Sequence, residues 1–452
     1  MQELSANVFD ALRRENIPYC LLRDGHQLDR LDGGGEVDLL VDDGQLPRLE
    51  ALLARFGFVR LRAWGHFPHQ FFVAYDEPSG GWLKFDVVTT LAYGRPTRSL
   101  CLPLAEGCLA RRDRCGPVFV LSAEDELITL LLHCVLDKGY FAPARRKRIC
   151  DLRRRLGDPR RLAQLLRTSK APGASWSNIA YLIDTENWPA LLAESNRIAA
   201  HWARRDRIGI LARRVRDRLL RKLHRWFGVI RPRALSVAVV APDGAGKSTV
   251  IASVEKSFYF PSRSIYMGLY PKRPAARAGR RMPGIGLAAN LIRQWGRCLA
   301  GRYHRARGRM VLFDRYAYDA LIPPAKRPGR LGRWRRRLLA AACPAPDLVV
   351  MLDAPGKMLF SRKQEHSAAI LERQRQGYLE LRQCLPQMVV VDATTDVRSV
   401  CRRVTSLIWQ CHAQRLQRGC PRSRSAVSAR VNGRSRIERT LFLGQPRRRT
   451  SR

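Results

Sequence analysis

The chain has 452 residues, 46% of them hydrophobic, so it is long enough for two or three domains that each bury a core. Its 82 Lys and Arg against 39 Asp and Glu give a formal net charge of +43, which disfavours basic partners and predicts weak contact with polyanions or an anionic membrane surface. The twelve cysteines form no Cys-x-x-Cys pair, which argues against a zinc site or a disulfide framework and predicts reduced thiols in a cytoplasmic protein.

Residues 1–120 predict an α+β domain. The first residues contain acidic side chains and no long apolar core, so they do not read as a secretory signal, and no run of about 18 apolar residues predicts a membrane span. Residues 15–58 read as a strand, a glycine turn, a strand and a helix. Glu36 and Asp38 alternate on one expected strand and share a face, and Asp86 is central in a later strand, "WLKFDVVTT". Carboxylates converging from neighbouring strands can bind Mg²⁺ for nucleotidyl transfer.

This arrangement resembles the polymerase-β-like nucleotidyltransferase superfamily, which has a glycine turn, an acid-x-acid strand and a third acid on a later strand. The resemblance implies that Gly25 is the turn glycine and that Glu36, Asp38 and Asp86 are metal ligands. His26 stands where the family prefers Ser, and Glu36 where it prefers Asp. Two interpretations stay open: an active nucleotidyltransferase, and a degenerate domain whose acids face solvent.

Residues 121–233 predict a helical connector. Ser122 and Asp125 form a capping box at its first helix, and His133 lies in an apolar stretch and is expected in the core. Residues 197–233 contain thirteen Arg or Lys against two Asp, with apolar residues at helical spacing. Such a basic amphipathic helix could lie on anionic lipid. The alternative, which we favour from sequence, is that its apolar stripe packs on the neighbouring domain.

Residues 234–412 alternate between apolar strands and helices, which predicts a parallel α/β sheet covered by helices on both faces. The ligand site of such a sheet lies at the carboxyl ends of its strands. The expected strands are 235–241, 263–269, 309–316, 346–355 and 387–394, and the expected helices are 246–258, 286–308 and 396–416.

The stretch "APDGAGKST" joins the first of these strands to a helix and predicts a phosphate-binding loop. Backbone N–H groups and the helix N-terminus would surround phosphate oxygens. Lys247 would reach the β and γ phosphates, and the Ser248 hydroxyl would bind Mg²⁺. Ala241 stands where the pattern has its first glycine, which requires a backbone conformation that a methyl group tolerates. The expected nucleotide-binding residues are Asp243, Gly244, Ala245, Gly246, Lys247, Ser248 and Thr249.

Polar residues end two further strands of this half. Asp314 closes "MVLFD" and can hold Mg²⁺, and Arg315 follows with a planar fork suited to phosphate. Asp353 closes "VVMLD" and could also serve the metal. Two strand-end aspartates beside a phosphate loop favour a catalytic role over simple helix capping.

The motifs "APDGAGKST", "FDRY" and "PDLVVMLDAP…SRK…ERQRQGYLEL" resemble the thymidylate kinase family of P-loop kinases over residues 235–412. The resemblance implies that Asp314 and Arg315 lie between metal and acceptor phosphate. It also implies that Arg362, Arg373 and Arg375 belong to a lid that closes over the transferred phosphoryl group. The family's Arg-Glu-Pro-Gly acceptor segment is replaced here by the basic, proline-rich residues 266–283, and a further basic loop follows "DRY", so thymidylate is not expected to be an efficient acceptor.

Residues 413–452 are Arg-rich with few apolar residues and predict a disordered basic tail. The sequence as a whole predicts an ATP- and Mg²⁺-dependent kinase acting on a nucleoside monophosphate or sugar phosphate. The context of similar two-domain proteins among bacterial polysaccharide genes is implied by the resemblance alone. Two alternatives stay open: a nucleic-acid-end kinase or binder, and a non-catalytic regulatory module that binds ATP.

Overall fold

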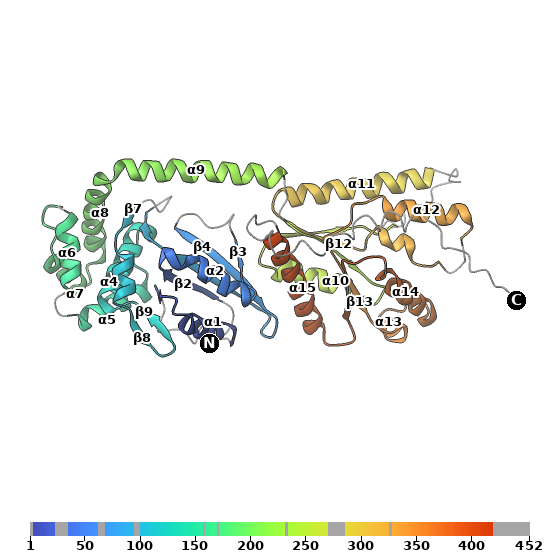
Figure 1. Ribbon diagram of the computed structural model, residues 1–452, viewed down its shortest axis with the longest axis horizontal. Coiled ribbons are helices and arrows are strands. Elements are labelled where there is room, and N and C mark those ends of the chain that lie inside the picture. Colours follow the sequence, from blue (N-terminus) through green and yellow to red (C-terminus); the bar gives the residue numbers. More distant parts are fainter. Residues whose placement is uncertain are drawn as a thin grey trace. The chain divides into compact units, whose positions relative to one another are not determined.

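The computed structural model (Figure 1) describes residues 3–22, 35–61, 68–94, 100–156, 159–169, 171–230, 234–269, 285–324 and 328–418. By residue contacts the chain divides into two compact units, Met1–Arg225 and Trp226–Arg452. Among the described residues, no helix is long and apolar enough to cross a membrane.

The first unit is built on a mixed sheet in the order β3-β4-β5-β2-β1-β9-β8. The pairs β2–β5 and β1–β9 are parallel, and the other neighbours are antiparallel. The strands are β1 Tyr19–Leu21, β2 Gly35–Val41, β3 Val59–Arg60, β4 His69–Asp76, β5 Gly81–Val88, β8 Asp113–Cys115 and β9 Val118–Val120; β6 Leu91–Tyr93 and β7 Leu100–Leu102 form a separate ribbon.

Successive residues of this sheet belong to two different cores, because side chains alternate between the faces of a strand. Tyr19 and Leu39 pack in a core with Phe9 of helix α1 (Glu3–Arg14) and Leu52 of helix α2 (Leu46–Arg55). Cys20 and Leu40, one residue further along, belong to a second core that extends through the helices after residue 120 to Ile198. Both faces of the sheet are therefore covered.

The helices predicted as a connector share this second core with the sheet. Helix α4 begins after Ser122, whose hydroxyl accepts a hydrogen bond from the backbone N–H of Asp125, so the predicted cap is confirmed. His133 is buried, as predicted, and its Nδ1 lies 3.0 Å from a carboxylate oxygen of Asp137. The other helices are η2 Asp43–Gln45, α3 Ala105–Ala110, α4 Ala123–Leu132, the π-helix η3 His133–Lys138, α5 Pro143–Arg155, α6 Arg160–Ser169, α7 Trp176–Asp184 and α8 Trp188–Arg205. Helix α9, Arg207–Ile230, begins in this unit and continues past its last residue, Arg225.

The second unit contains the predicted parallel sheet, in the order β11-β12-β10-β13-β14. Each of the five expected strands is present, because short Val-rich runs bounded by polar residues suit a sheet that is buried on both faces. The bounds are β10 Ser236–Val240, β11 Ser262–Tyr266, β12 Met310–Asp314, β13 Leu348–Asp353 and β14 Met388–Asp392.

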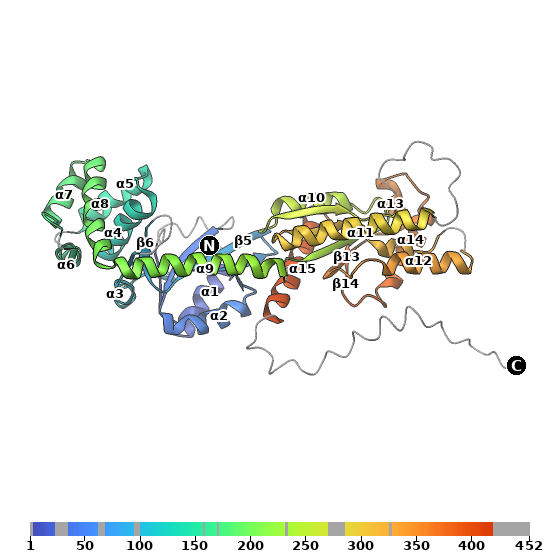
Figure 2. The same cartoon turned by 90° about the horizontal axis from the view of Figure 1, so that it is seen from above.

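Helices cover both faces of this parallel sheet, which confirms the expected α/β architecture. Helices α11 and α14 pack in one core with Ala238 and Val240 of β10, and α11 lies along this face in Figure 2. Helices α10 and α15 contact each other and the strands from the opposite side. The helices are α10 Lys247–Ser257, α11 Ile285–Ala306, η4 Ala317–Leu321, α12 Arg330–Ala341, α13 Gly356–Arg362, α14 Ala368–Leu381 and α15 Val397–Arg418.

Helix α15 continues past the predicted start of the tail, so residues 413–418 are helical. In this part of the helix, the guanidinium of Arg415 lies 2.7 Å from a carboxylate oxygen of Asp347, just before β13. Residues 419–452 lie outside the described residues. The eleven described cysteines are free thiols, in agreement with the expected absence of a disulfide framework.

Candidate functional site

The order of the parallel sheet places β10 between β12 and β13, so that the residues after these three strands share one edge. The loop after β10 passes directly into α10, whose first residue is Lys247. Gly244 and Gly246 have φ values of +88° and +83°, which L-residues rarely adopt. A Cβ at Gly244 would also lie 2.5 Å from the carbonyl oxygen of Leu359. Ala241 is not among the described non-glycine residues with positive φ, which explains why alanine is accepted there.

Lys247 is turned into its own loop. Its ammonium group donates hydrogen bonds to the carbonyl oxygens of Ala241 (2.9 Å) and Pro242 (2.7 Å) and lies 3.4 Å from a carboxylate oxygen of Asp243. Only 7% of the side chain is exposed. Burial, followed by the nearby charge of Arg315, lowers the pKa of Lys247 to about 8. The cation is thus held at the phosphate loop by acceptors weaker than a phosphate oxygen.

Arg315 joins the phosphate loop to the residues that follow β12. It is one of the few described non-glycine residues with positive φ, at +67°, and this conformation directs its guanidinium onto Asp243. A second guanidinium N–H donates to Asp319 over 3.4 Å, and the hydroxyl of Tyr378 donates to the other oxygen of Asp319 over 2.8 Å. Burial would raise the pKa of Asp243, but Lys247 and Arg315 together lower it, so that carboxylate stays ionised.

Asp314 lies where the sequence predicted it, at the end of β12. Its strand register aligns it with Val239 of β10 and Tyr266 of β11, and its charge acts on Lys247. Ser248 is the second residue of α10 and its side chain is exposed. A hydroxyl and a carboxylate beside a phosphate loop are oxygen donors that suit Mg²⁺. Binding of Mg²⁺ by these two residues stays a prediction.

Asp353 is engaged by another residue of the predicted site. Arg375 on α14 donates to both oxygens of Asp353, over 2.6 and 3.0 Å, and also to Glu372 over 2.8 Å. This bidentate pair ties α14 to the end of β13, and a metal-binding role for Asp353 stays a prediction. Of the other predicted lid arginines, Arg362 on α13 donates to the carbonyl of Ala393 over 3.0 Å, and Arg373 is exposed on α14. Their closure over a phosphoryl group also stays a prediction.

Sequence reasoning missed several polar residues beside Arg315. Asp319 and Tyr378 complete its hydrogen-bond network, and burial raises the pKa of both. Arg297 of α11 lies over the ring of Tyr266, 5.3 Å from its centroid. The spacing "DRYAYD" could have drawn attention to Asp319, but no local pattern identifies Tyr378. Most of the rebuilt acceptor segment, residues 270–284, lies outside the described residues.

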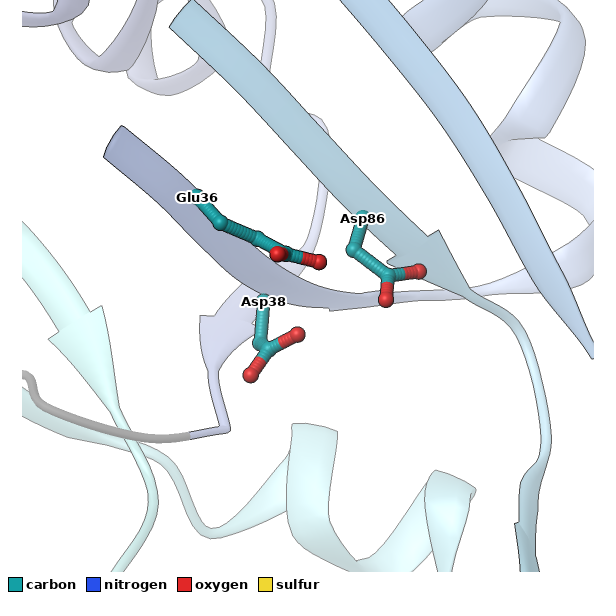
Figure 3. Close-up of side chains that lie close together, drawn as sticks. All are labelled: Glu36, Asp38 and Asp86. Atoms are coloured by element: carbon teal, nitrogen blue, oxygen red, sulfur yellow. The ribbon is translucent and has the colours of Figure 1, made fainter. Parts of the chain in front are cut away.

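A second polar cluster lies in the first unit, where the structure brings together Glu36, Asp38 and Asp86. The parallel register of β2 and β5 places Asp38 directly beside Asp86. One ligand atom from each of the three residues lies within 4.8 Å of the others, and Figure 3 shows the carboxyl groups turned toward a common space. This is the convergence that the alternating acids predicted, and three hard oxygen donors fit a divalent cation.

Two nitrogen-bearing side chains adjoin the acid cluster. His69, on β4, has Nδ1 at 2.6 and 2.8 Å from the two carboxylate oxygens of Asp86. Lys84, on β5, donates to Glu36 over 2.7 Å. Asp86 is buried and Glu36 is exposed, so the cluster opens to solvent at the Glu36 side. Gly25, the predicted turn glycine, lies outside the described residues.

The chain was compared with known proteins. A scan against protein-family models gives no match. A probable thymidylate kinase from Thermococcus gammatolerans is 31% identical over 111 residues, which are 23% of this chain and 52% of that protein, so the chain spans about half the length of this curated relative. A structure of deoxyadenosine kinase from M. mycoides with bound dATP matches at a TM-score of 0.28 and 16% identity, covering 38% of this chain and 96% of that one. The local sequence similarity, with the phosphate loop, supports a P-loop nucleoside-kinase-like region.

Proposed function

We propose that residues 234–412 transfer the γ-phosphoryl group of ATP to a small phosphorylated acceptor, a nucleoside monophosphate or a sugar phosphate. The observation that carries the proposal is that Lys247 and Arg315 converge on the same carboxylate oxygen of Asp243 at the phosphate loop. To bind phosphate, each cation requires a phosphate oxygen in place of its present carbonyl or carboxylate acceptors. The triphosphate of ATP and an acceptor phosphate would meet this requirement together.

The transfer requires little beyond positioning and charge. An oxygen of the acceptor phosphate attacks the γ-phosphorus, the bond from this phosphorus to the β–γ bridging oxygen breaks, and ADP leaves. A phosphate monoester has its second pKa near 6, so the attacking oxygen is already deprotonated at neutral pH and needs no general base. Lys247 would donate hydrogen bonds to the β and γ phosphates, while Arg315 would orient the acceptor phosphate. Bound Mg²⁺, held by Ser248 and Asp314, would neutralise charge on the phosphates.

The acceptor side favours a compound other than thymidylate. This chain lacks the Arg-Glu-Pro-Gly segment of thymidylate kinases, and the basic residues 266–283 stand in the place of that segment. The described start of this segment presents Tyr266 beneath Arg297. A cation over an aromatic ring can stack on a planar base or pair with a further phosphate. Stacking on a base suits a nucleoside monophosphate, and pairing with a phosphate suits either of the two proposed acceptor classes.

The experiment is a screen of acceptors with γ-labelled ATP: nucleoside monophosphates, then sugar phosphates, then oligonucleotides. We expect transfer to one of the first two classes, and loss of that transfer in Lys247→Ala by a factor of about 10³, the scale of one transition-state cation. Lys256→Ala is the matched control, because Lys256 is exposed on the same helix. Transfer that survives Lys247→Ala in folded protein would refute the assignment. Transfer to oligonucleotides alone would favour the nucleic-acid-end kinase. ATP binding without any transfer would favour the regulatory module.

For the first unit we propose a divalent-cation site at Glu36, Asp38 and Asp86, of the kind that nucleotidyltransferases use. Support comes from the convergence of the three carboxylates in the parallel register of β2 and β5. Lys84 donates to Glu36, so a bound cation would compete with this ammonium group for the carboxylate.

The test is a thermal melt of the full-length, nucleotide-free protein with and without Mg²⁺. A cation bound only by folded protein raises the unfolding temperature by mass action. Asp38→Asn should remove the part of this rise that belongs to the acid cluster, because an amide oxygen is a poorer ligand for a hard cation. Asp113→Asn, an exposed aspartate of the same unit, is the control and should leave the rise unchanged. An identical rise in wild type and Asp38→Asn would show that the cluster holds no Mg²⁺.

A further inference from the structure

Helix α9 carries an apolar stripe that the rest of the first unit leaves exposed. Its members are aliphatic and recur every three or four residues, so they lie on one side of the helix. Their exposed fractions are high for side chains of this kind: Ile208 86%, Leu211 63%, Val215 46%, Leu219 55% and Leu223 50%. Isolated exposed leucines are ordinary, but a stripe that continues over four turns marks a surface that binds something.

The helix is attached to the first unit by its other side. Ile210 and Asp217 are the residues of α9 with the lowest described exposure, at 9% and 7%. At about 100° of rotation per residue, both lie roughly opposite the centre of the stripe. The charges of Arg213 and Asp206 act on Cys101 of β7, which places this inward side near that strand. An ordinary surface helix buries its apolar stripe and exposes its charges, so α9 has the reverse orientation.

Basic residues line the stripe. Arg214, Arg218 and Lys222 are exposed and follow one border of the apolar side chains at the spacing of one helical turn. The one acid within the helix, Asp217, is on the buried side. The exposed surface of α9 is therefore apolar at its centre and cationic at its border.

We propose that this surface lies on an anionic phospholipid membrane, with the stripe inserted among the acyl chains near the headgroups and the basic residues in contact with lipid phosphates. The charge of the helix selects this occupant. A second copy of α9 would bring another cationic border against the first. Residues 226–452 of the same chain contain 45 Lys and Arg against 12 Asp and Glu, so they also repel it. A nucleic acid would satisfy the charges but would leave the aliphatic centre without a partner.

The proposal is independent of the kinase assignment, and the test uses the full chain. Binding to vesicles of phosphatidylcholine, with and without phosphatidylglycerol, is measured by co-sedimentation. The basic chain attracts any anionic surface, so the decisive variant keeps every charge: Leu211→Gln with Leu219→Gln. We expect its affinity for anionic vesicles to fall about thirtyfold, which corresponds to half the transfer free energy of two leucines. The difference should persist near 1 M salt, where the screening length is about 3 Å and purely electrostatic binding disappears.

A matched pair on another helix controls for apolar exposure in general. Ile292 and Leu299 of α11 are 73% and 58% exposed, and Ile292→Gln with Leu299→Gln should leave vesicle binding within about twofold of wild type, as surface changes away from a binding site do. Far-UV circular dichroism and an unchanged thermal unfolding transition confirm that each variant is folded.

Four results would overturn the proposal. Equal vesicle affinity of wild type and Leu211→Gln/Leu219→Gln would show that charge alone binds the lipid. Equal affinity for neutral and anionic vesicles would show that the basic border plays no part. Self-association that the leucine variant abolishes, in a protein that ignores vesicles, would make a second copy the occupant; binding to duplex DNA but not to vesicles would assign the surface to nucleic acid.

Discussion

The two glycines of the phosphate loop offer a matched test of how the loop is built. Gly244 and Gly246 share the same backbone requirement, with φ of +88° and +83°, but differ in their surroundings. A Cβ at Gly246 would meet nothing within 4 Å, whereas a Cβ at Gly244 would lie 2.5 Å from the carbonyl oxygen of Leu359 and 3.2 Å from its carbon. Substitution by alanine therefore separates conformational strain from steric overlap.

The expected magnitudes follow from these distances. Placing an L-residue at positive φ costs about 1–2 kcal/mol, and this applies to both Gly244→Ala and Gly246→Ala. Replacing glycine by alanine also lowers the conformational entropy of the unfolded chain, which offsets part of this cost; the offset is the same for both variants and cancels in the comparison. Only Gly244→Ala adds overlap with a backbone carbonyl, which forces α13 away from the loop at about 1–3 kcal/mol, the usual cost of overpacking. We expect Gly246→Ala to destabilise by about 1 kcal/mol and Gly244→Ala by about 3 kcal/mol.

The assay is thermal unfolding, in which the transition of the P-loop unit is identified in wild type as the one that ATP shifts. At about 2–4 °C per kcal/mol, the two variants should differ by about 4–8 °C. Binding of a fluorescent ATP analogue gives a second measurement, and Gly244→Ala should weaken it more. Equal unfolding temperatures for the two variants would refute the reasoning, because they would mean that the loop and α13 are not in contact.

Two further outcomes follow from the charges of this site. Burial lowers the pKa of Lys247 to about 8 in the free protein, and a bound phosphate must raise this pKa, so ATP binding should take up a proton and the affinity for ATP should fall as pH rises through 8. Calorimetry in buffers of different ionisation enthalpy measures the proton uptake. An affinity that does not change with pH would contradict this prediction. The side chains of Arg375 and Asp353 are 22% and 20% exposed. In a double-mutant cycle of the unfolding free energy, this bidentate pair should give a coupling of about 1–2 kcal/mol. A coupling near zero would show that the pair does not hold α14 against β13.

The sequence predicted the parallel sheet well because its signal is local. Val-rich runs such as 236–240 and 348–353 can be buried on both faces only in such a sheet, and each is a strand. The phosphate loop was predicted for the same reason, because each of its glycines is required by the positive φ at its own position. Glu36 and Asp38 share one strand, so alternation alone predicted that they point the same way.

Other features depend on partners distant in sequence and could not be predicted. Asp353 looks like a free strand-end carboxylate until Arg375, on another element, is seen to bind both its oxygens. The sharing of one core between the sheet of the first unit and helices as far as Ile198 likewise depends on tertiary packing. The orientation of α9 is the clearest case. Amphipathic spacing identifies the stripe but not the side on which the helix is attached.

The two candidate sites share one electrostatic arrangement. In each, carboxylates and cations from different strands or loops are paired before any ligand binds: Asp243 with Lys247 and Arg315 in one, Glu36 with Lys84 in the other. Internal pairing keeps partly buried charges from being left uncompensated, which costs far more than a surface charge. It also means that a ligand competes with an existing partner. A triphosphate can displace Asp243 because it offers both cations stronger acceptors at once, whereas a neutral molecule of similar size cannot. If residues 234–412 bind a triphosphate as proposed, the pairs that the fold has already made would favour polyanionic ligands over neutral ones.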